Sequence, residues 1–542
     1  MNNSIYKLEK PANEPTLDYA PGSDEILLLN EEIERQSGIQ VEIPIIVGGK
    51  EIRTGNTADM VMPHDHRHKL GFFHKAGKAE VAAAIESALA AKREWAALSW
   101  DDRASISLKA AHLVSTKYRY LINAATMLCQ SKNIWQAEID AACETADFLR
   151  FNPYNASQLF SFLQPLQSYT TFNRLECRPL EGFIYAVTPF NFTSIACNLN
   201  MAPAILGNTT VWKPATASLL SSYYLMRILK EAGLPDGVIN FVPGSGSVIS
   251  DVVLKHKHFA GLHFTGSNLT FNELWKQISG NLSGYCSYPR IAGETGGKDF
   301  IFAHSSADTD ALAAAITLGA FEYQGQKCSA ASRSYIPRSI WPELKEKLLS
   351  LVAKIKVGDP TDPKNLMGAV IDEKSFDSVT PYLEAARKSP DVEILTGGKF
   401  DKSKGYFIEP TLLLCGDSKY ATMETELFAP VMSIYVYDDD KFEETLKLCD
   451  ETSPYGLTGS VFSRDKYAAA KVSEVLKYAA GNFYINDKTT GAMVGQQPFG
   501  GSRASGTNDK VGSVFNLIRW MNPRSIKENY SPQDDIIYPH MR

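Results

Sequence analysis

Cys328 is the residue whose surroundings best suit covalent chemistry. It lies in the small polar segment Gln324-Gly-Gln-Lys-Cys-Ser-Ala-Ala-Ser332, directly after an Ala-rich helical run. The other seven cysteines lie mostly in apolar or amphipathic runs, where cysteine packs as a small hydrophobe. A thiol is mostly protonated at neutral pH, so a nucleophilic cysteine needs a base or a positive charge nearby. Taken alone, Cys328 fits both a nucleophile and a packed core residue.

Two further polar residues could complete such a site. Glu294, in the string GETGGKD, stands beside a Gly-Gly turn, where a carboxylate can enter a cleft and act as a base. The alternative is a solvated loop acid. Asn191, in TPFNF, follows a predicted strand, where a parallel α/β sheet presents its ligand crevice. Its amide could stabilise an oxyanion or cap the following helix.

Polar groups at two other predicted strand ends suit a nucleotide. Lys213 ends the predicted strand 210–213 and could contact a ribose or a phosphate. Gly266 and Ser267 lie between a strand and a helix, where glycine permits close approach of a pyrophosphate to the helix N-terminus. Neither a GxGxxG fingerprint nor a GxxxxGK[ST] loop follows any predicted strand, so no standard dinucleotide motif is present.

The elements that must position these residues alternate along the chain. Amphipathic helices are predicted over 80–98 and 103–130, and a β-hairpin over 167–187 with its turn near 177–179. Strands at 183–187, 210–213, 239–242 and 261–264 then alternate with helices at 193–206, 217–232, 247–255 and 268–278. Such βα repeats predict a parallel sheet with helices on both faces.

A second α/β series follows Pro289. Its predicted strands lie near 300–302, 333–336, 406–408, 431–437, 459–462 and 482–485, with a helix at 341–355. The tail 519–542 has no core of its own, so its apolar residues need a covering surface.

Composition excludes several classes of function. The 542 residues carry a net charge of −6, which makes nucleic acid an unlikely partner, and the 44% apolar content supports a large core. Eight sparse cysteines form neither a disulfide framework nor a CxxC metal site, so we expect no metal. The longest apolar run is too short to cross a membrane. Without a readable signal or transit peptide we expect a cytoplasmic protein, or a mitochondrial one if a presequence was removed.

The motifs PFNF, WKP, FTGS, ETGGKD, GQKCSA, ELFAP and QPFGG, in this order, resemble the aldehyde dehydrogenase superfamily from about Asn13 onward. The resemblance implies a Rossmann-type NAD-binding domain over 1–166 and 188–289 and a second α/β catalytic domain over 290–515. It also implies oligomerisation elements at 167–187 and 516–542, and hence a homodimer or an assembly of dimers.

The flanking strings FEYQGQKCSAASRSYIP and GNFYINDKTTGAMVGQQPFGG are similar to those of members that oxidise glutamate γ-semialdehyde to glutamate in proline catabolism. That semialdehyde arises by hydrolysis of Δ1-pyrroline-5-carboxylate. One alternative is another semialdehyde. The other is a catalytically silent structural member, which should lack Cys328, Glu294 or Asn191. Because the matching region fills nearly the whole chain, no fused proline dehydrogenase domain is expected.

The resemblance also implies roles for single residues. Cys328 matches the nucleophile, Glu294 the base for thioester hydrolysis and Asn191 an oxyanion donor. The expected cofactor is NAD, with weaker use of NADP because Thr216 stands where many members have a discriminating Glu. Its expected contacts are Pro189, Phe190, Lys213, Gly266, Ser267, Glu426 and Phe428. The expected substrate contacts are the aromatic walls Phe192 and Phe499 and the anchor residues Ser329, Gly491 and Ala492.

Two further positions depart from the family pattern. One loop bears on how the substrate is held. Ala429 replaces a usual glycine, and Ala492 replaces a serine found in some relatives. The loop 489–501 contains no lysine or arginine, which predicts that neutral donors hold the substrate carboxylate.

Overall fold

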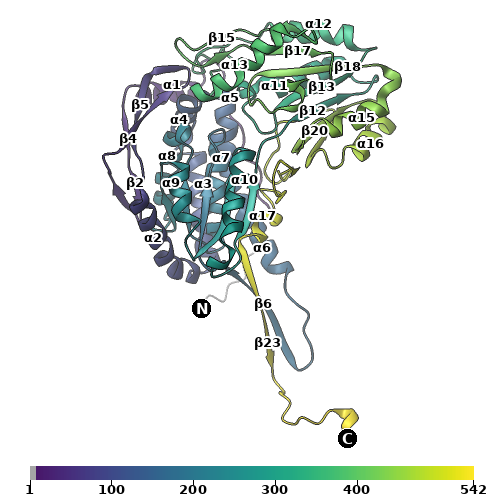
Figure 1. Ribbon diagram of the computed structural model, residues 1–542. Helices are drawn as coiled ribbons and strands as arrows, with labels where there is room; N and C mark the ends of the chain where they lie inside the picture. The colour runs from purple at the N-terminus through teal and green to yellow at the C-terminus, as the bar shows by residue number, and fades with distance from the viewer. Residues whose placement is uncertain (1–7) are drawn as a thin grey trace.

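The computed structural model describes residues 8–542. Within this range the chain forms two α/β units, each built on a seven-stranded sheet, and a long two-stranded arm that leaves the body (Figure 1). The α/β class predicted from the alternating pattern is confirmed.

The first sheet has the order β11-β10-β7-β8-β9-β2-β3. Its strands are β11 Arg290–Glu294, β10 Phe259–Thr265, β7 Phe183–Val187, β8 Thr210–Lys213, β9 Ile239–Phe241, β2 Ile45–Val47 and β3 Lys50–Ile52. The strands from β11 to β9 pair in parallel, and β2 and β3 add an antiparallel edge. The carboxyl ends of the parallel strands therefore lie along one edge of the sheet, as a ligand crevice requires.

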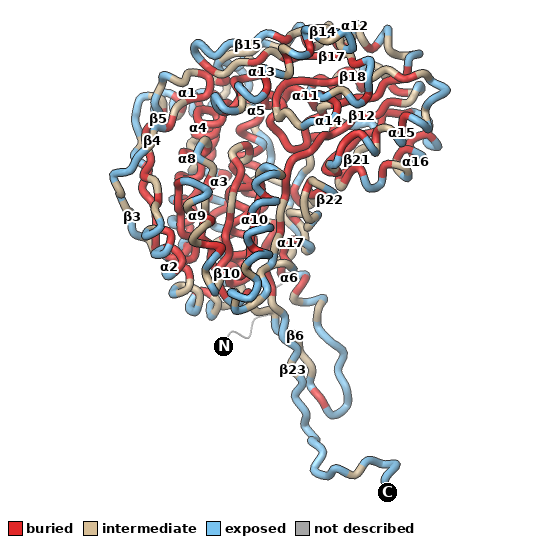
Figure 2. The backbone as a smooth tube through the Cα atoms, viewed as in Figure 1, coloured by how far each residue is buried: buried red, intermediate tan, exposed pale blue. Residues whose placement is uncertain are grey.

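Helices cover both faces of this first sheet. One face packs on α2 Lys78–Ala97, α9 Gly246–Val253 and α10 Asn268–Gly280. The other packs on α3 Trp100–Ser115, α4 Arg119–Gln130, α6 Thr145–Phe162, α7 Thr193–Ile205 and α8 Leu219–Ala232. Figure 2 shows the strands buried between these layers. Burial on both faces explains why the strands read as continuous apolar runs.

The second sheet has the order β14-β17-β18-β13-β12-β20-β21. Its strands are β14 Val392–Thr396, β17 Thr411–Cys415, β18 Val431–Tyr437, β13 Ala331–Pro337, β12 Asp299–Ala303, β20 Thr458–Phe462 and β21 Asn482–Ile485. All neighbours are parallel except β14, which pairs antiparallel with β17. Its helices include α11 Thr309–Phe321, α12 Trp341–Val352, α13 Glu373–Lys388, α15 Phe442–Glu451 and α16 Lys466–Val475.

Smaller elements complete the body. The helix α1 Asp24–Ser37 precedes a three-stranded sheet formed by β1 Val41–Ile43, β5 Asp65–His74 and β4 Thr57–Met62. Two-residue ladders join β15 Phe400–Asp401 to β16 Phe407–Ile408 and β19 Tyr455–Gly456 to β22 Ser502–Arg503. Among residues 8–542, no helix is both long enough and apolar enough to cross a bilayer.

The single helix predicted over 103–130 is two helices. α3 ends at Ser115 and α4 begins at Arg119. The Arg119 guanidinium reaches Glu14, the backbone oxygen of Pro15 and the buried Glu138, so the chain turns where these partners lie. Sequence periodicity continues across this turn because both helices bury apolar faces.

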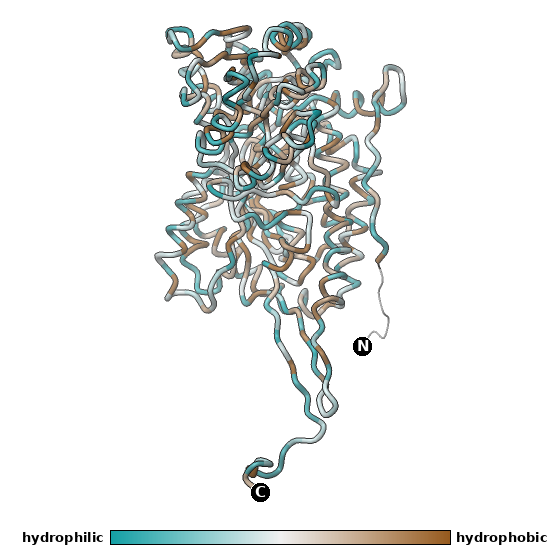
Figure 3. The backbone as a smooth tube through the Cα atoms, turned by 90° about the vertical axis from the view of Figure 1, so that its right-hand side faces the viewer, coloured by the Kyte–Doolittle hydropathy of each residue, from teal (hydrophilic) through white to brown (hydrophobic). Residues whose placement is uncertain are grey.

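The hairpin predicted over 167–187 does not form. Its first half is β6 Thr171–Pro179, which pairs antiparallel with β23 Met521–Asn529, whereas its second half is β7 in the first sheet. The alternating pattern indicates strands but carries no information about partners far away in the sequence. The arm made by β6 and β23 projects from the body in both views (Figures 1 and 3), and its residues are exposed or half-buried except at Thr171 and Met521 (Figure 2).

We expect Trp520→Ala to lower the free energy of unfolding by about 3–5 kcal/mol, the usual cost of emptying a buried aromatic site. Trp520 is fully buried where β23 leaves the body, its ring centroid 4.6 Å from that of His263, and its carbonyl accepts from Asn208 at 2.9 Å. Urea denaturation should show this loss. Tyr530→Ala, at an exposed position beyond β23, is the control and should change stability little; equal losses would contradict the assignment of Trp520 as the anchor.

Candidate active site

Cys328 lies in a tight turn between helix α11 and strand β13 of the second α/β unit. Tyr323, Gln324 and Gly325 all have positive φ, at 50°, 56° and 68°, so the chain reverses sharply before the cysteine. A side chain at position 325 would lie 2.3 Å from the carbonyl oxygen of Ala429, so glycine is required there. The strained turn aims Cys328 at a cavity instead of the core.

Glu294 reaches the same cavity from the first sheet. It is the last residue of β11, paired with Thr265 of β10. The cavity between the two sheets is lined by residues from both, including Cys328, Glu294, Phe192, Ser329, Gly491, Ala492 and Phe499. The structure therefore brings the expected nucleophile, the expected base and all five expected substrate contacts to one place.

Burial dominates the electrostatics of this pair. It raises the pKa of Glu294 to about 8, against a smaller opposing effect of Lys510, and Oε1 of Glu294 has no hydrogen-bond partner in the described part of the chain. Burial, followed by the charges of Glu294 and Asp299, raises the pKa of the Cys328 thiol well above its usual range. The thiol is thus protonated at rest, and a base must take its proton.

Asn191 donates from its side-chain amide to the backbone oxygen of Gln326 at 3.0 Å. This bond places it two residues from Cys328 and leaves its second N–H without a described partner. The backbone N–H of Cys328 also bonds to no other described residue. Two free donors beside one nucleophile suit a developing oxyanion. Asn191 does not cap α7, because Asp140 accepts from the first N–H groups of that helix.

Asp140 and Lys132 are functional-site residues that the sequence analysis missed. Asp140 accepts from the backbone N–H groups of Thr193 and Ser194, both at 2.9 Å, and from Lys132 Nζ at 2.7 Å. The Lys132 ammonium lies 4.3 Å from the ring centroid of Phe192. This fully buried ion pair fixes the start of α7, directly after Asn191 and Phe192. The available signal was Asp140 among the alanines of Glu138–Glu144; Lys132, between two helices, carried none.

Glu144 is a second missed residue. It lines the cavity at the end of a π-helical turn, Glu138–Glu144, a feature frequent at functional sites. Burial and the Asp140 charge raise its pKa to about 8, and it accepts from Ser194 Oγ at 2.7 Å. The two lysines of the cavity, Lys327 and Lys488, both pair with Glu322, at 3.0 and 2.8 Å. Glu144 and Glu294 are therefore the two cavity carboxylates that make no hydrogen bond to a lysine or arginine within residues 8–542.

The expected cofactor residues lie at the strand ends of the first sheet and beside Glu426. Lys213 ends β8, and its largely buried ammonium has no hydrogen bond or ion pair with residues 8–542, so it suits a ribose hydroxyl or phosphate. Ser267 caps α10 by accepting from the N–H of Thr270 at 3.3 Å, and Gly266 precedes it. The helix N-terminus and the unpaired ammonium fit an anionic dinucleotide.

Glu426 and Phe428 complete this set. Glu426 accepts from the N–H of Gly297 at 2.9 Å, and burial raises its pKa to about 7. The Phe428 ring meets that of Phe190 edge-on, with centroids 5.8 Å apart. Pro189 directly precedes Phe190 in the loop between β7 and α7. Among residues 8–542 no cluster of His, Cys, Asp and Glu could hold a metal ion.

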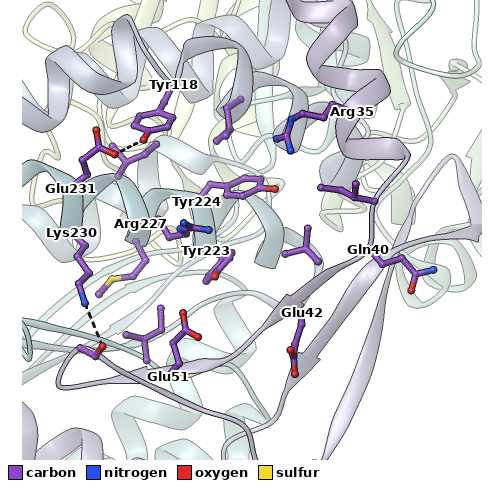
Figure 4. Close-up of a pocket in the computed structure, with 17 residues that line it drawn as sticks. Arg35, Gln40, Glu42, Glu51, Tyr118, Tyr223, Tyr224, Arg227, Lys230 and Glu231 are labelled. Atoms are coloured by element: carbon purple, nitrogen blue, oxygen red, sulfur yellow. Dashed lines mark hydrogen bonds between the residues drawn. The ribbon is translucent and has the colours of Figure 1, made fainter.

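A second cavity, of about 830 Å³, lies elsewhere on the first unit (Figure 4). It is lined by Tyr118, Tyr223, Tyr224, Arg227 and several charged residues, and Glu231 binds the hydroxyl of Tyr118 there. It contains no cysteine and none of the residues expected to act on a substrate.

The chain belongs to the aldehyde dehydrogenase family, whose model matches residues 52–526. Similar proteins within this family share a more specific enzyme name. The chain is 51% identical to "Delta-1-pyrroline-5-carboxylate dehydrogenase, mitochondrial" of Dictyostelium discoideum, over 98% of this chain and 96% of that one. It is 48% identical to the Homo sapiens enzyme of the same name, over 98% and 95%. The Mycobacterium tuberculosis Delta-pyrroline-5-carboxylate dehydrogenase, solved "bound with NAD", superposes with a TM-score of 0.96 at 47% identity over both full chains.

We expect kcat to rise between pH 7 and pH 9 with a midpoint near 8. The pKa of Glu294 is raised to about 8, so the carboxylate, the form that acts as a base, accumulates above that pH and disappears below it. Steady-state rates across this range test the expectation. Glu294→Gln should keep a pre-steady-state burst of NADH, lose about 10²- to 10⁴-fold in kcat and flatten the profile. An unchanged profile in the variant would assign the base elsewhere.

Asp140→Asn should cost about 3–5 kcal/mol of unfolding free energy, because it leaves Lys132 as an unpaired buried charge. The double variant Asp140→Asn, Lys132→Met removes both charges and should recover part of this loss. Urea denaturation of the single and double variants measures both effects. If the double variant is as unstable as the sum of the two single variants, the ion pair is not the source of the loss.

Proposed function

We propose that this chain oxidises glutamate γ-semialdehyde to glutamate with NAD as the hydride acceptor. The observation that carries the proposal is the single cavity in which Cys328 and Glu294 face an anchor of Ser329, Gly491 and Ala492. A reacting end and a recognition end in one cavity suit a short substrate that carries an aldehyde at one end and an amino acid at the other.

In the first half of the reaction, the Cys328 sulfur forms a bond to the aldehyde carbon while the thiol proton leaves to a water molecule in the cavity. The carbonyl oxygen becomes an oxyanion, which the free N–H groups of Asn191 and Cys328 are placed to hold. Lys213, Ser267 and Glu426 would hold NAD, which supplies the acceptor for the hydride lost from that carbon. Cys328 is left as a thioester.

In the second half, Glu294 takes a proton from water, and the resulting hydroxide attacks the thioester carbon. The carbon–sulfur bond breaks, glutamate leaves and Cys328 returns as the thiol after reprotonation. The raised pKa of Glu294 suits this exchange, because a base near working pH both accepts and releases protons readily.

Recognition of the amino-acid end rests on opposite chemistries within the cavity. Ser329 and the backbone of Gly491 and Ala492 offer neutral donors to the α-carboxylate, while Glu144 faces the α-ammonium group. Because Lys327 and Lys488 both pair with Glu322, neither lysine is unpaired, and the carboxylate is held chiefly by hydrogen bonds from Ser329 and the loop. Such a site rejects analogues that leave its buried donors unpaired.

Features outside the cavity support the proposed oligomeric assembly and the proposed cellular compartment. The arm formed by β6 and β23, with the neighbouring exposed apolar residues Phe162, Leu166 and Tyr169, supports a homodimer or an assembly of dimers. All eight cysteines are free, which suits a reducing compartment, either the cytoplasm or the mitochondrial matrix. Thr216 in place of a discriminating acid supports weaker use of NADP.

The test compares Δ1-pyrroline-5-carboxylate with butanal, which lacks the amino-acid group. We expect kcat/KM for butanal to be lower by about two or more orders of magnitude, because the anchor donors then stay unpaired. NADH production at 340 nm measures both. Ser329→Ala should narrow the gap, and Cys328→Ala should abolish both activities without changing thermal unfolding. Equal kcat/KM for the two aldehydes in the wild type would refute the proposed substrate.

A further inference from the structure

An extended N-terminal segment, residues 13–19, runs from the substrate loop to the helices of the first unit; we call it the strap. Its backbone is held at Leu17 by Glu138, whose Oε1 accepts at 2.9 Å, and at Pro15, whose oxygen accepts from Arg119 at 2.7 Å. The Glu14 carboxylate pairs with Arg119 and Arg150, at 2.7 and 2.6 Å. The strap is therefore fixed by charged groups along most of its length.

Asn13 joins this strap to the loop that anchors the substrate. Its Nδ2 donates to Asp147 Oδ2 at 2.7 Å and to the backbone oxygen of Val494 at 2.8 Å. Its Oδ1 accepts from Gln496 Nε2 at 2.8 Å. One side chain thus uses both of its N–H groups and its oxygen, and two of these three bonds go to the loop 491–497.

The same loop packs on the helix that carries Asp147. Val494 packs with Phe148 and Phe151 of α6, and a side chain at Gly495 would lie 2.2 Å from the Phe151 ring. Asp147 completes the connection, because its Oδ1 accepts from the backbone N–H of Glu14 at 2.8 Å. The loop therefore has an apolar contact with α6 on one side and a polar clasp through Asn13 on the other.

We propose that Asn13 is a positioning residue for substrate selectivity: it holds the loop of Gly491 and Ala492 at the distance from Cys328 that the amino-acid end of the substrate requires. This inference rests on the proposed function of that loop. Asn13 does not line the cavity, so it acts through Val494 and Gln496 and not by contact with substrate. The family model begins at residue 52, so the strap lies outside the part of the chain that this model describes.

Loss of Asn13 should therefore impair recognition of the amino-acid end of the substrate and not the reaction at its aldehyde end. Loosening the loop should weaken the grip on the α-carboxylate and leave the chemistry at Cys328 intact. An aldehyde without an amino-acid group makes no hydrogen bond to the donors of the loop, so its oxidation should depend little on Asn13. A merely structural role would instead lower both activities together.

The experiment compares Asn13→Ala with wild type on pyrroline-5-carboxylate and on butanal. We expect KM for pyrroline-5-carboxylate to rise about five- to twenty-fold, the effect of losing one or two part-buried hydrogen bonds, with kcat within about twofold. Both constants for butanal should stay within about twofold. The inhibition constant of glutamate, measured against butanal, should rise by the same factor as the KM for pyrroline-5-carboxylate.

Two further variants protect the test against a folding defect. Gln496→Ala removes one of the two bonds to the loop at an exposed position and should produce a smaller shift in the same direction. Asp18→Ala changes an exposed residue of the same strap and should match wild type in all three measurements. Thermal unfolding reports the integrity of each variant.

The outcomes separate the two proposals. Loss of butanal and pyrroline-5-carboxylate oxidation in equal proportion, or wild-type constants in Asn13→Ala, would overturn the role of Asn13. Failure of the wild type to prefer pyrroline-5-carboxylate would overturn the proposed substrate instead, whatever the variants do.

Discussion

The whole site depends on the close approach of two backbone segments. One follows Glu294 at the end of the first sheet, and the other is the turn that carries Cys328. Gly297 lies so near the carbonyl of Cys328 that an added Cβ would be 2.5 Å from that oxygen. The Gly-Gly pair after Glu294 therefore lets the end of the first sheet press directly on the turn that carries the nucleophile. Asp299, two residues further along, accepts from the N–H of Thr458 at 2.6 Å and so ties the start of β12 to the start of β20. A bulkier residue at 297 would separate the base from the sulfur.

That contact also sets the electrostatics. Three carboxylates, of Glu294, Asp299 and Glu426, act on the Cys328 thiol from within a buried region, and each has its own pKa raised by burial. A resting site of this kind keeps its thiol protonated and unreactive. The Cys328 thiol becomes reactive only after a proton transfer within the site and depends on what binds beside it. Little reactive thiolate is therefore exposed when no substrate is present.

Buried ion pairs hold the frame around this site. Lys132 with Asp140 fixes the start of α7, and Arg119 with Glu138 and Glu14 fixes the strap. Such pairs contribute little net stability compared with apolar packing, because both charges lose their hydration. Their value here is geometric, since the first pair fixes a segment that borders the cavity and the second fixes the strap that contacts the loop 491–497. The left-handed turn before Cys328 serves the same end at the cost of backbone strain.

The sequence by itself determined the chemistry and most of the local structure. Short segments of the sequence are enough to show three features: the polar setting of Cys328, the glycines after Glu294, and the alternation of strands and helices. This is because propensity and turn chemistry act over a few residues. The ordered motifs determined the family in the same way. Thus β7 to β10 and the helices between them lie where the periodicity predicts them.

Only the tertiary structure decided which distant segments meet. The pairing of β6 with β23, the break between α3 and α4, the capping of α7 by Asp140 and the clasp of Asn13 on Val494 all join residues that no local pattern relates. In the sequence, Asp140 and Glu144 are only charged residues within a helical segment. In the folded chain both lie on the wall of the cavity. The physical reason is that burial and long-range hydrogen bonds depend on packing of the whole chain, whereas the sequence pattern records only which face of each element is apolar.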